Sequence, residues 1–237
     1  FDQYQVLKPR EKTPVPMQLV DIDERSLQQF GQWPWPRNQL ARLIDTINDA
    51  GAAAIVIDVL LSEPDRLSPS AVANMIPDWP EYQSAREAIL GRTGHDEQLA
   101  QSLSRANSVL GFALDDEIVG EVPSLKAGLV RAGDPPDPFL PAFAGGISAL
   151  PLLTEAAEGY GACSLVPDPD GVVRRASLLV SVAGKVLPTL DAEALRVAQA
   201  ASTYIVKSTN ASGEESFGAP GGVVGVKIGG LTVPTDE

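Results

Sequence analysis

The sequence predicts an α/β fold in which a central, mostly parallel or mixed sheet is flanked by helices, with irregular insertions and C-terminal β-hairpins. Two patterns in the 237 residues carry this prediction. Amphipathic helical segments at 37–51, 95–107 and 190–200 alternate with short apolar, β-branched runs. The order strand–helix–strand–helix–strand over 17–114 favours parallel strands with right-handed crossovers.

The first strand is expected at 17–23, where a short apolar run ends in carboxylates. The helix at 37–51 has an apolar face, and Gly51 is suited to end it. The continuous run at 52–61 predicts a second strand, buried on both faces of the sheet.

Two long segments interrupt the alternation. Residues 62–94 are expected to form a loop with a short helix in EYQSAREAILG, and 115–150, rich in Gly, Pro and Asp, an irregular excursion. Between them lie a helix at 95–107, with Asp96 as a candidate N-cap, and a third strand at 108–114.

The last third predicts turns and hairpins. DPDG is expected as a turn, and VAGK as the closure of a hairpin. An amphipathic helix is expected at 190–200. A terminal hairpin follows at 223–234, with Gly229 and Gly230 in its turn.

The formal net charge of −13 disfavours binding to nucleic acid and to anionic membrane surfaces. The single cysteine, Cys163, and single histidine, His95, make zinc or cysteine chemistry improbable. Cys163 suits a small buried position, and His95 a capping or surface role.

Carboxylates gather near predicted strand ends, where ligand sites of parallel sheets lie. The set comprises Asp21, Asp23, Asp58, Glu63, Asp65, Asp168 and Asp170. Three interpretations stay open: structural ion pairs with Arg37, Arg174 or Arg175, a small-ligand rim, or a hard-cation site. If there is a metal site, Asp21, Asp23, Glu63 and Asp65 are its candidate ligands.

In WPWPR, each proline holds the preceding tryptophan extended, and Pro36 suits the start of the next helix. Trp33 and Trp35 therefore form a stiff aromatic ledge, either a ligand rim or a plug over the end of the core. We expect Arg37 to pair with Asp21, Asp23 or Asp58.

Four motifs occur together in order: D-x-D-x-x-S-L, W-P-W-P-R, D-x-x-x-x-E-P-D and P-D-x-D-G-x-x-R-R. Over nearly its whole length the chain resembles the type 2 CHASE domain, a bacterial extracytoplasmic sensory domain. Leu61 stands where that family often has Phe. The family's recurrent positions here are Asp21, Asp23, Ser26, Trp33, Pro34, Trp35, Pro36, Arg37, Asp58, Glu63, Pro64, Asp65, Asp168, Asp170, Gly171 and Arg174.

The resemblance implies one sensory domain over 1–237, with a core at 15–206 and a hairpin extension at 207–237. This would be a soluble, periplasmic piece of an inner-membrane receptor whose cytoplasmic output is a class III adenylate/guanylate cyclase or a kinase. The piece is expected to be non-catalytic and cofactor-free, to bind an unidentified small-molecule or ionic signal, and to form a homodimer. A metal-dependent hydrolase that uses the Asp21/Asp23/Glu63/Asp65 set, and a dimerisation module without ligand, remain the alternatives.

Overall fold

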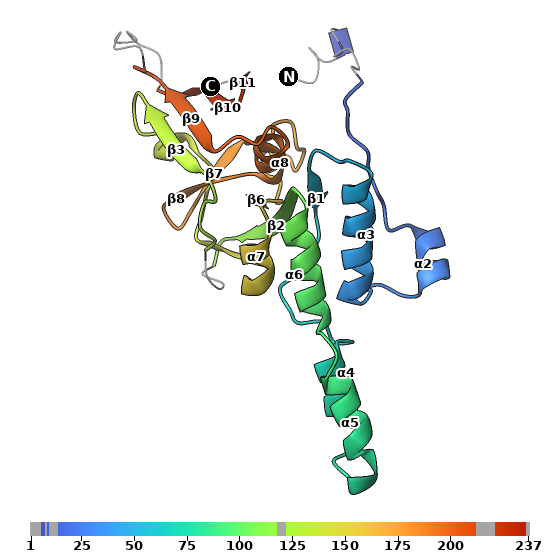
Figure 1. The fold of residues 1–237 in the computed structure, drawn as a ribbon. Helices are drawn as coiled ribbons and strands as arrows, with labels where there is room; N and C mark the ends of the chain where they lie inside the picture. The colour runs from blue at the N-terminus through green and yellow to red at the C-terminus, as the bar shows by residue number, and fades with distance from the viewer. Residues whose placement is uncertain (1–5, 8, 10–13, 118–121, 212–220, 236–237) are drawn as a thin grey trace. The chain divides into compact units, whose positions relative to one another are not determined.

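A computed structural model of the chain describes residues 6–7, 9, 14–117, 122–211 and 221–235 (Figure 1). The chain divides into two compact units, residues 1–35 and 36–237. The α/β class, the mixed sheets and the C-terminal hairpin strands are confirmed. No helix in the described ranges is long and apolar enough to cross a membrane.

In the first unit, residues 14–23 have no regular secondary structure and are mostly exposed, so the strand predicted at 17–23 is wrong. A strand needs a neighbour to share its hydrogen bonds, and the described part of this unit contains no other strand. Helix α2 (Glu24–Phe30) follows, and its first turn is capped by the Asp23 carboxylate, which accepts from Ser26 N at 2.9 Å.

The second unit contains a sheet centred on β2 (Ser108–Asp115), whose first five residues are all buried. Parallel neighbours β1 (Ile55–Ile57) and β6 (Gly159–Ala162) flank β2, and β5 (Gly145–Ile147) pairs with its far end in antiparallel orientation. The strand predicted over 52–61 is shorter and lies at the sheet edge. Val56 is consequently 44% exposed rather than buried on both faces.

Helices accompany this sheet, three of them at the predicted 37–51, 95–107 and 190–200, whereas α7 was not predicted. Helix α3 (Arg37–Asp49) packs against α6 (His95–Arg105), which in turn packs against α7 (Pro151–Ala156). Helix α8 (Leu190–Ala198) packs on β2 and β6. The α6 N-cap is Gly94 rather than the predicted Asp96, because the Asp96 carboxylate accepts a hydrogen bond from Asp65 N instead.

The remaining strands form two further mixed sheets. One has the order β11–β10–β9–β3, from β3 (Gly128–Ala132), β9 (Thr203–Ser208), β10 (Val223–Ile228) and β11 (Leu231–Pro234). The other has the order β4–β7–β8, from β4 (Ala142–Phe143), β7 (Leu179–Val182) and β8 (Lys185–Pro188). A short 3₁₀ turn, η2 (Asp137–Phe139), precedes β4.

Two predicted tight turns are confirmed. Ala183 and Gly184 close the β7–β8 hairpin with φ of 48° and 76°, which suits the twist of the flanking strands. Gly229, with φ of 57°, begins the β10–β11 turn.

A buried ionic network joins α8 to two of the sheets. Glu193 is fully buried and forms a bidentate pair with Arg196, with nitrogen–oxygen distances of 2.8 and 2.9 Å. The Tyr204 hydroxyl of β9 and the Tyr160 N–H of β6 donate to the same carboxylate. The network therefore holds β6 and β9 to one helix.

Residues 66–94, which we call the arm, project away from the rest of the second unit (Figure 1). The arm contains α4 (Pro69–Met75), the 3₁₀ turn η1 (Pro80–Tyr82) and α5 (Gln83–Leu90). The helix predicted within EYQSAREAILG is thus confirmed as α5. Helix α4 was not predicted, although Ser68 caps it and Pro69 begins it, and both features favour the start of a helix.

Candidate functional site

Two predicted residues, Arg37 and Asp65, meet in a buried cluster at the base of the arm, and His95 and Asp96 complete it. We call these four residues the arm-base cluster. Asp65 Oδ2 accepts from the Arg37 backbone N–H and lies 2.8 Å from His95 Nδ1, while Asp65 N donates to Asp96 Oδ2 at 2.9 Å. Asp65 and His95 flank the arm in the sequence, so these contacts fasten the two ends of the arm to each other.

The electrostatics of Asp65 favour its charged form. Burial alone would raise the pKa of Asp65, but hydrogen bonds from Leu67 N, Arg37 N and His95 outweigh it, and the pKa lies below its ordinary value. The carboxylate is thus a stable anion that also neutralises part of the N-terminal end of α3, where Arg37 N has no intrahelical partner.

Asp96 has the opposite bias. Burial raises the pKa of its carboxyl group, although the hydrogen bond from Asp65 N and the charge of Arg37 act against this. Arg37 Nε lies 3.8 Å from Asp96 Oδ1, and neither atom has a hydrogen-bond partner among the described residues. The charge partner of Arg37 in the second unit is therefore Asp96, not Asp58 as predicted. Its pairing with Asp21 or Asp23 stays a prediction.

Asp58 and Glu63 contribute no buried charge. Asp58 follows the end of β1 and is exposed, so it does not need the cation that a buried position would require. Burial, followed by the charge of Asp58, raises the pKa of the Cys163 thiol, which donates to Phe112 O at 3.1 Å. Glu63 uses its backbone carbonyl, 3.5 Å from Arg37 Nη2, and leaves its side chain exposed.

Trp33 and Trp35 form an aromatic cluster with Phe30 inside the first unit. Trp35 is 9% exposed, and its ring meets those of Phe30 and Trp33 edge to face, with centroids 5.5 and 5.9 Å apart. Its indole N–H donates to Gly31 O at 2.9 Å. Asp21 is exposed. The proposed role of the two tryptophans in covering the end of the sheet stays a prediction.

Two further predicted carboxylates, Asp168 and Asp170, lie in the DPDG turn. Gly171, with φ of 80°, closes this turn by donating from its N–H to Asp168 O at 2.8 Å. Arg174 pairs with Asp168 at 3.0 Å and with Asp170 through two hydrogen bonds of 2.8 Å. Chiefly because of this bond with Arg174, the pKa of Asp170 is lowered to about 2.

Two of the residues predicted as metal ligands already have other roles. Asp65 accepts from two backbone N–H groups and contacts His95, while Asp23 caps α2. Among the described residues, no group of three or more His, Cys, Asp or Glu side chains is arranged to hold a metal ion.

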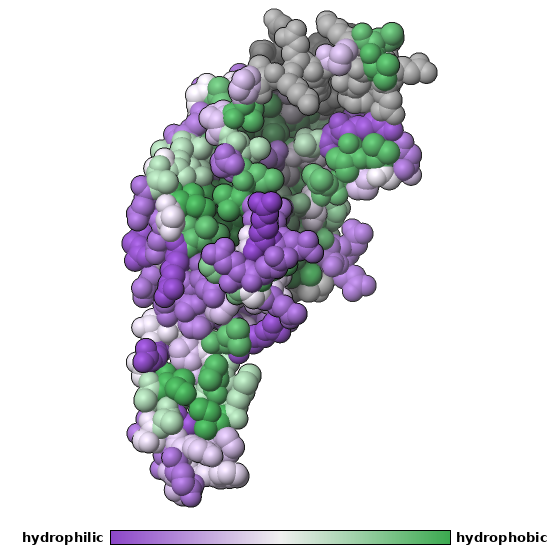
Figure 2. Space-filling view, turned by 90° about the vertical axis from the view of Figure 1, so that its right-hand side faces the viewer, coloured by the Kyte–Doolittle hydropathy of each residue, from purple (hydrophilic) through white to green (hydrophobic). Residues whose placement is uncertain are grey.

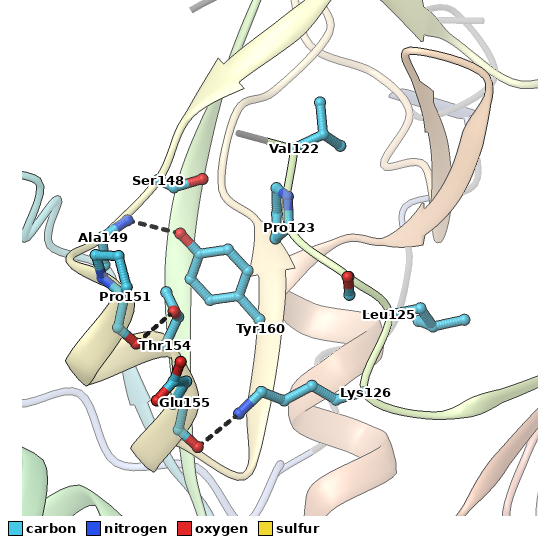
Figure 3. Close-up of a pocket in the computed structure, with 11 residues that line it drawn as sticks. Val122, Pro123, Leu125, Lys126, Ser148, Ala149, Pro151, Thr154, Glu155 and Tyr160 are labelled. Carbon is cyan, nitrogen blue, oxygen red and sulfur yellow. Dashed lines mark hydrogen bonds between the residues drawn. The ribbon is translucent and has the colours of Figure 1, made fainter. Parts of the chain in front are cut away.

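A cavity of about 540 Å³ lies elsewhere in the second unit (Figure 3). Segment 122–126, residues 148–149, helix α7 and Tyr160 of β6 form its walls. Its volume lies within the range of small-molecule sites, which is roughly 300–1,000 Å³. None of the residues predicted for the ligand rim is among those that line it.

Tyr160 and Lys126 are two of the polar residues that line this cavity, and the others are Ser124, Ser148, Thr154 and Glu155. The Tyr160 hydroxyl accepts from Ala149 N at 2.7 Å, its ring stacks on Phe112, and burial raises its pKa. Lys126 Nζ donates to the carbonyls of Glu155 and Ala157 at the end of α7, as Figure 3 shows for Glu155. An ammonium group has three donors, so one of them has no partner among the described residues.

Sequence reasoning missed both the cavity and half of the arm-base cluster. Lys126 and Tyr160 are far apart in the chain, and the segment that carries Lys126 was interpreted only as an irregular excursion. For the cluster a signal existed: the only histidine stands directly before Asp96, at the start of a predicted helix.

The model of one protein family, the CHASE2 domain, matches residues 1–237. CHASE2 domains are extracytoplasmic sensory domains and are not themselves catalytic. No curated protein and no solved structure was found to match the chain.

Proposed function

Since the chain belongs to the CHASE2 family, we propose that it is the input domain of a membrane-anchored receptor whose cytoplasmic output is a class III adenylate/guanylate cyclase or a kinase. A signal that binds two conformations of the domain unequally shifts their populations, and the output follows that shift. The match over the whole chain is what supports this assignment.

The cavity beside Lys126 is the proposed place of the signal. Its walls are mixed in polarity, and its free donor favours a small organic ligand with a carbonyl or carboxylate oxygen. The contact with segment 122–126 matters for transmission. This segment leads into β3, which pairs with β9, and β9 pairs with the C-terminal strands β10 and β11.

A thermal-shift screen tests the binding step. The panel is amino acids, sugars, nucleotides, inorganic anions and cations. A ligand at 100 times its Kd should stabilise the folded chain by about 2.7 kcal/mol. Lys126→Met should weaken the binding of a hit at least about tenfold, because it removes the free donor. Lys185→Met, an exposed lysine of the β7–β8 hairpin, is the matched control.

Two results would count against the site. One is a panel without any stabilising compound, and the other is a hit whose affinity Lys126→Met leaves unchanged. The output is tested separately, on the full receptor in lipid vesicles: the hit should change cyclic-nucleotide synthesis or phosphoryl transfer, and Lys126→Met should shift that response to at least about tenfold higher concentrations of the hit.

A further inference from the structure

The arm (residues 66–94) is covered by little of the rest of the second unit and exposes large apolar side chains. Figure 2 shows apolar surface gathered along this projecting part. Met75 is 71% exposed, Trp79 58% and Leu90 52%. Trp79 stacks on Tyr82, which is itself 40% exposed, so the two aromatic rings form one exposed apolar group.

Helix α5 is too short to be stable in isolation. It has eight residues and no buried one. Isolated helices shorter than about 12–15 residues are marginal in water, and helices in proteins persist mainly because an apolar face is covered. An exposed group of large apolar residues of this kind marks an interaction surface.

The charge of the arm indicates what covers it. Arg66, Arg86 and Arg92 balance Asp78, Glu81 and Glu87, so the arm has no net charge. The whole chain carries −13, and all of this excess therefore lies outside the arm. Two copies of so acidic a chain repel each other except where they meet through a neutral surface. The arm is such a surface, and it projects from the acidic body.

We propose that the arm is a docking surface for the arm of a second copy of this chain. The contact would be isologous, with Trp79, Tyr82 and Met75 of each copy packed against the α4–α5 pair of the other. The arm-base cluster gives the arm a fixed direction, because Asp65 joins its two ends through His95 and Asp96. This inference goes beyond the proposed function and does not require the signal.

Sedimentation equilibrium of the chain measures the association. At about 100 µM the wild-type chain should be largely dimeric, as expected for an interface of modest size. Trp79→Glu should weaken dimerisation at least about tenfold, because it introduces a charge at the centre of the contact. Leu165→Glu, which alters a residue 66% exposed in the loop after β6, should leave the mass unchanged.

Salt and hydrogen exchange provide two further readouts. Raising ionic strength from about 0.05 M to about 0.5 M should strengthen the dimer by screening the acidic bodies. Amide exchange in α5 should slow as protein concentration rises, which requires no variant.

Several outcomes overturn the proposal: a monomer at all concentrations, a dimer insensitive to Trp79→Glu, or a dimer that salt dissociates. Binding of the wild-type chain to neutral phosphatidylcholine vesicles, lost in Trp79→Glu and without self-association, would also overturn it, and would assign the arm to a lipid surface.

Discussion

The backbone N–H of Arg37 donates a 2.8 Å hydrogen bond to the buried carboxylate of Asp65. The same oxygen lies 2.8 Å from His95 Nδ1, and the other oxygen accepts from Leu67 N at 2.8 Å. One carboxylate thus joins the start of α3, the start of α6 and the first residues of the arm. The E-P-D motif is best understood as the fastening of the arm to the body.

Asp65→Asn should destabilise the chain by about 2–4 kcal/mol. The amide has only one acceptor oxygen, whereas both oxygens of the Asp65 carboxylate accept hydrogen bonds. Since the pKa of Asp65 is depressed by folding, its contribution is present above about pH 4 and fades as pH falls below that value. Urea unfolding at pH 7 and pH 3, followed by tryptophan fluorescence, measures both effects.

Glu63→Gln is the matched control, because Glu63 stands two positions before Asp65 and its side chain is exposed. It should change the free energy of unfolding by less than about 0.5 kcal/mol. Equal losses in the two variants would contradict the fastening role of Asp65. Asp65→Asn should also speed amide exchange within the arm and weaken dimerisation.

Arg37→Ala tests the charge partner of Asp96. At pH 7 the substitution should cost about 3 kcal/mol, because it leaves a buried carboxylate without its cation while the backbone bond to Asp65 remains. Folding raises the pKa of Asp96, so the charged form of its carboxyl group is disfavoured in the native state. Removing the charge of Arg37 should disfavour that form further. The penalty should therefore shrink as Asp96 becomes protonated below neutral pH.

Chemical denaturation from pH 7 to pH 4 measures this dependence. Arg37→Lys keeps a positive charge and should recover part of the loss. A penalty that stays constant over this range would mean that the side chain of Arg37 acts by packing rather than by its charge.

Local patterns predicted several regular elements of the second unit, although α4, α7 and the strands β3, β4 and β5 within 115–150 were not predicted. The apolar face of 37–51 and the run at 108–114 gave α3 and β2, and the small residues of VAGK gave a hairpin turn with two positive φ angles. These elements follow from short-range chemistry: spacing on one face, a stop residue, and a backbone conformation that few residues accept.

The predictions that failed depended on neighbours distant in sequence. The run at 17–23 has strand composition, but no partner strand pairs with it among the described residues. The run at 52–61 predicts a strand buried on both faces, which would bury Asp58, but β1 is short and lies at the edge of the sheet. His95 looked peripheral because the residue that it contacts is thirty positions away. Composition cannot supply pairings of this kind.

The Asp170–Arg174 pair can be tested without reference to stability. Arg174 holds the pKa of Asp170 at about 2 by a bidentate hydrogen bond on an exposed turn. Arg174→Gln should move the NMR titration midpoint of this carboxyl group up toward its ordinary value near 3.9. A midpoint that stays at about 2 in the variant would assign the shift to the turn backbone, where Val172 N also donates to Asp170.

The buried pair of Glu193 and Arg196 makes the sharpest prediction for the core. Glu193→Gln should destabilise the chain by about 3–5 kcal/mol, because Arg196 is only 3% exposed and keeps its charge without a counterion. Replacing both residues by Met should cost much less than Glu193→Gln alone, since no unpaired charge then remains buried. Urea unfolding of the three chains measures this. A double variant less stable than Glu193→Gln would show that the hydrogen bonds from Tyr204 and Tyr160, rather than neutralisation of Arg196, are what this carboxylate chiefly provides.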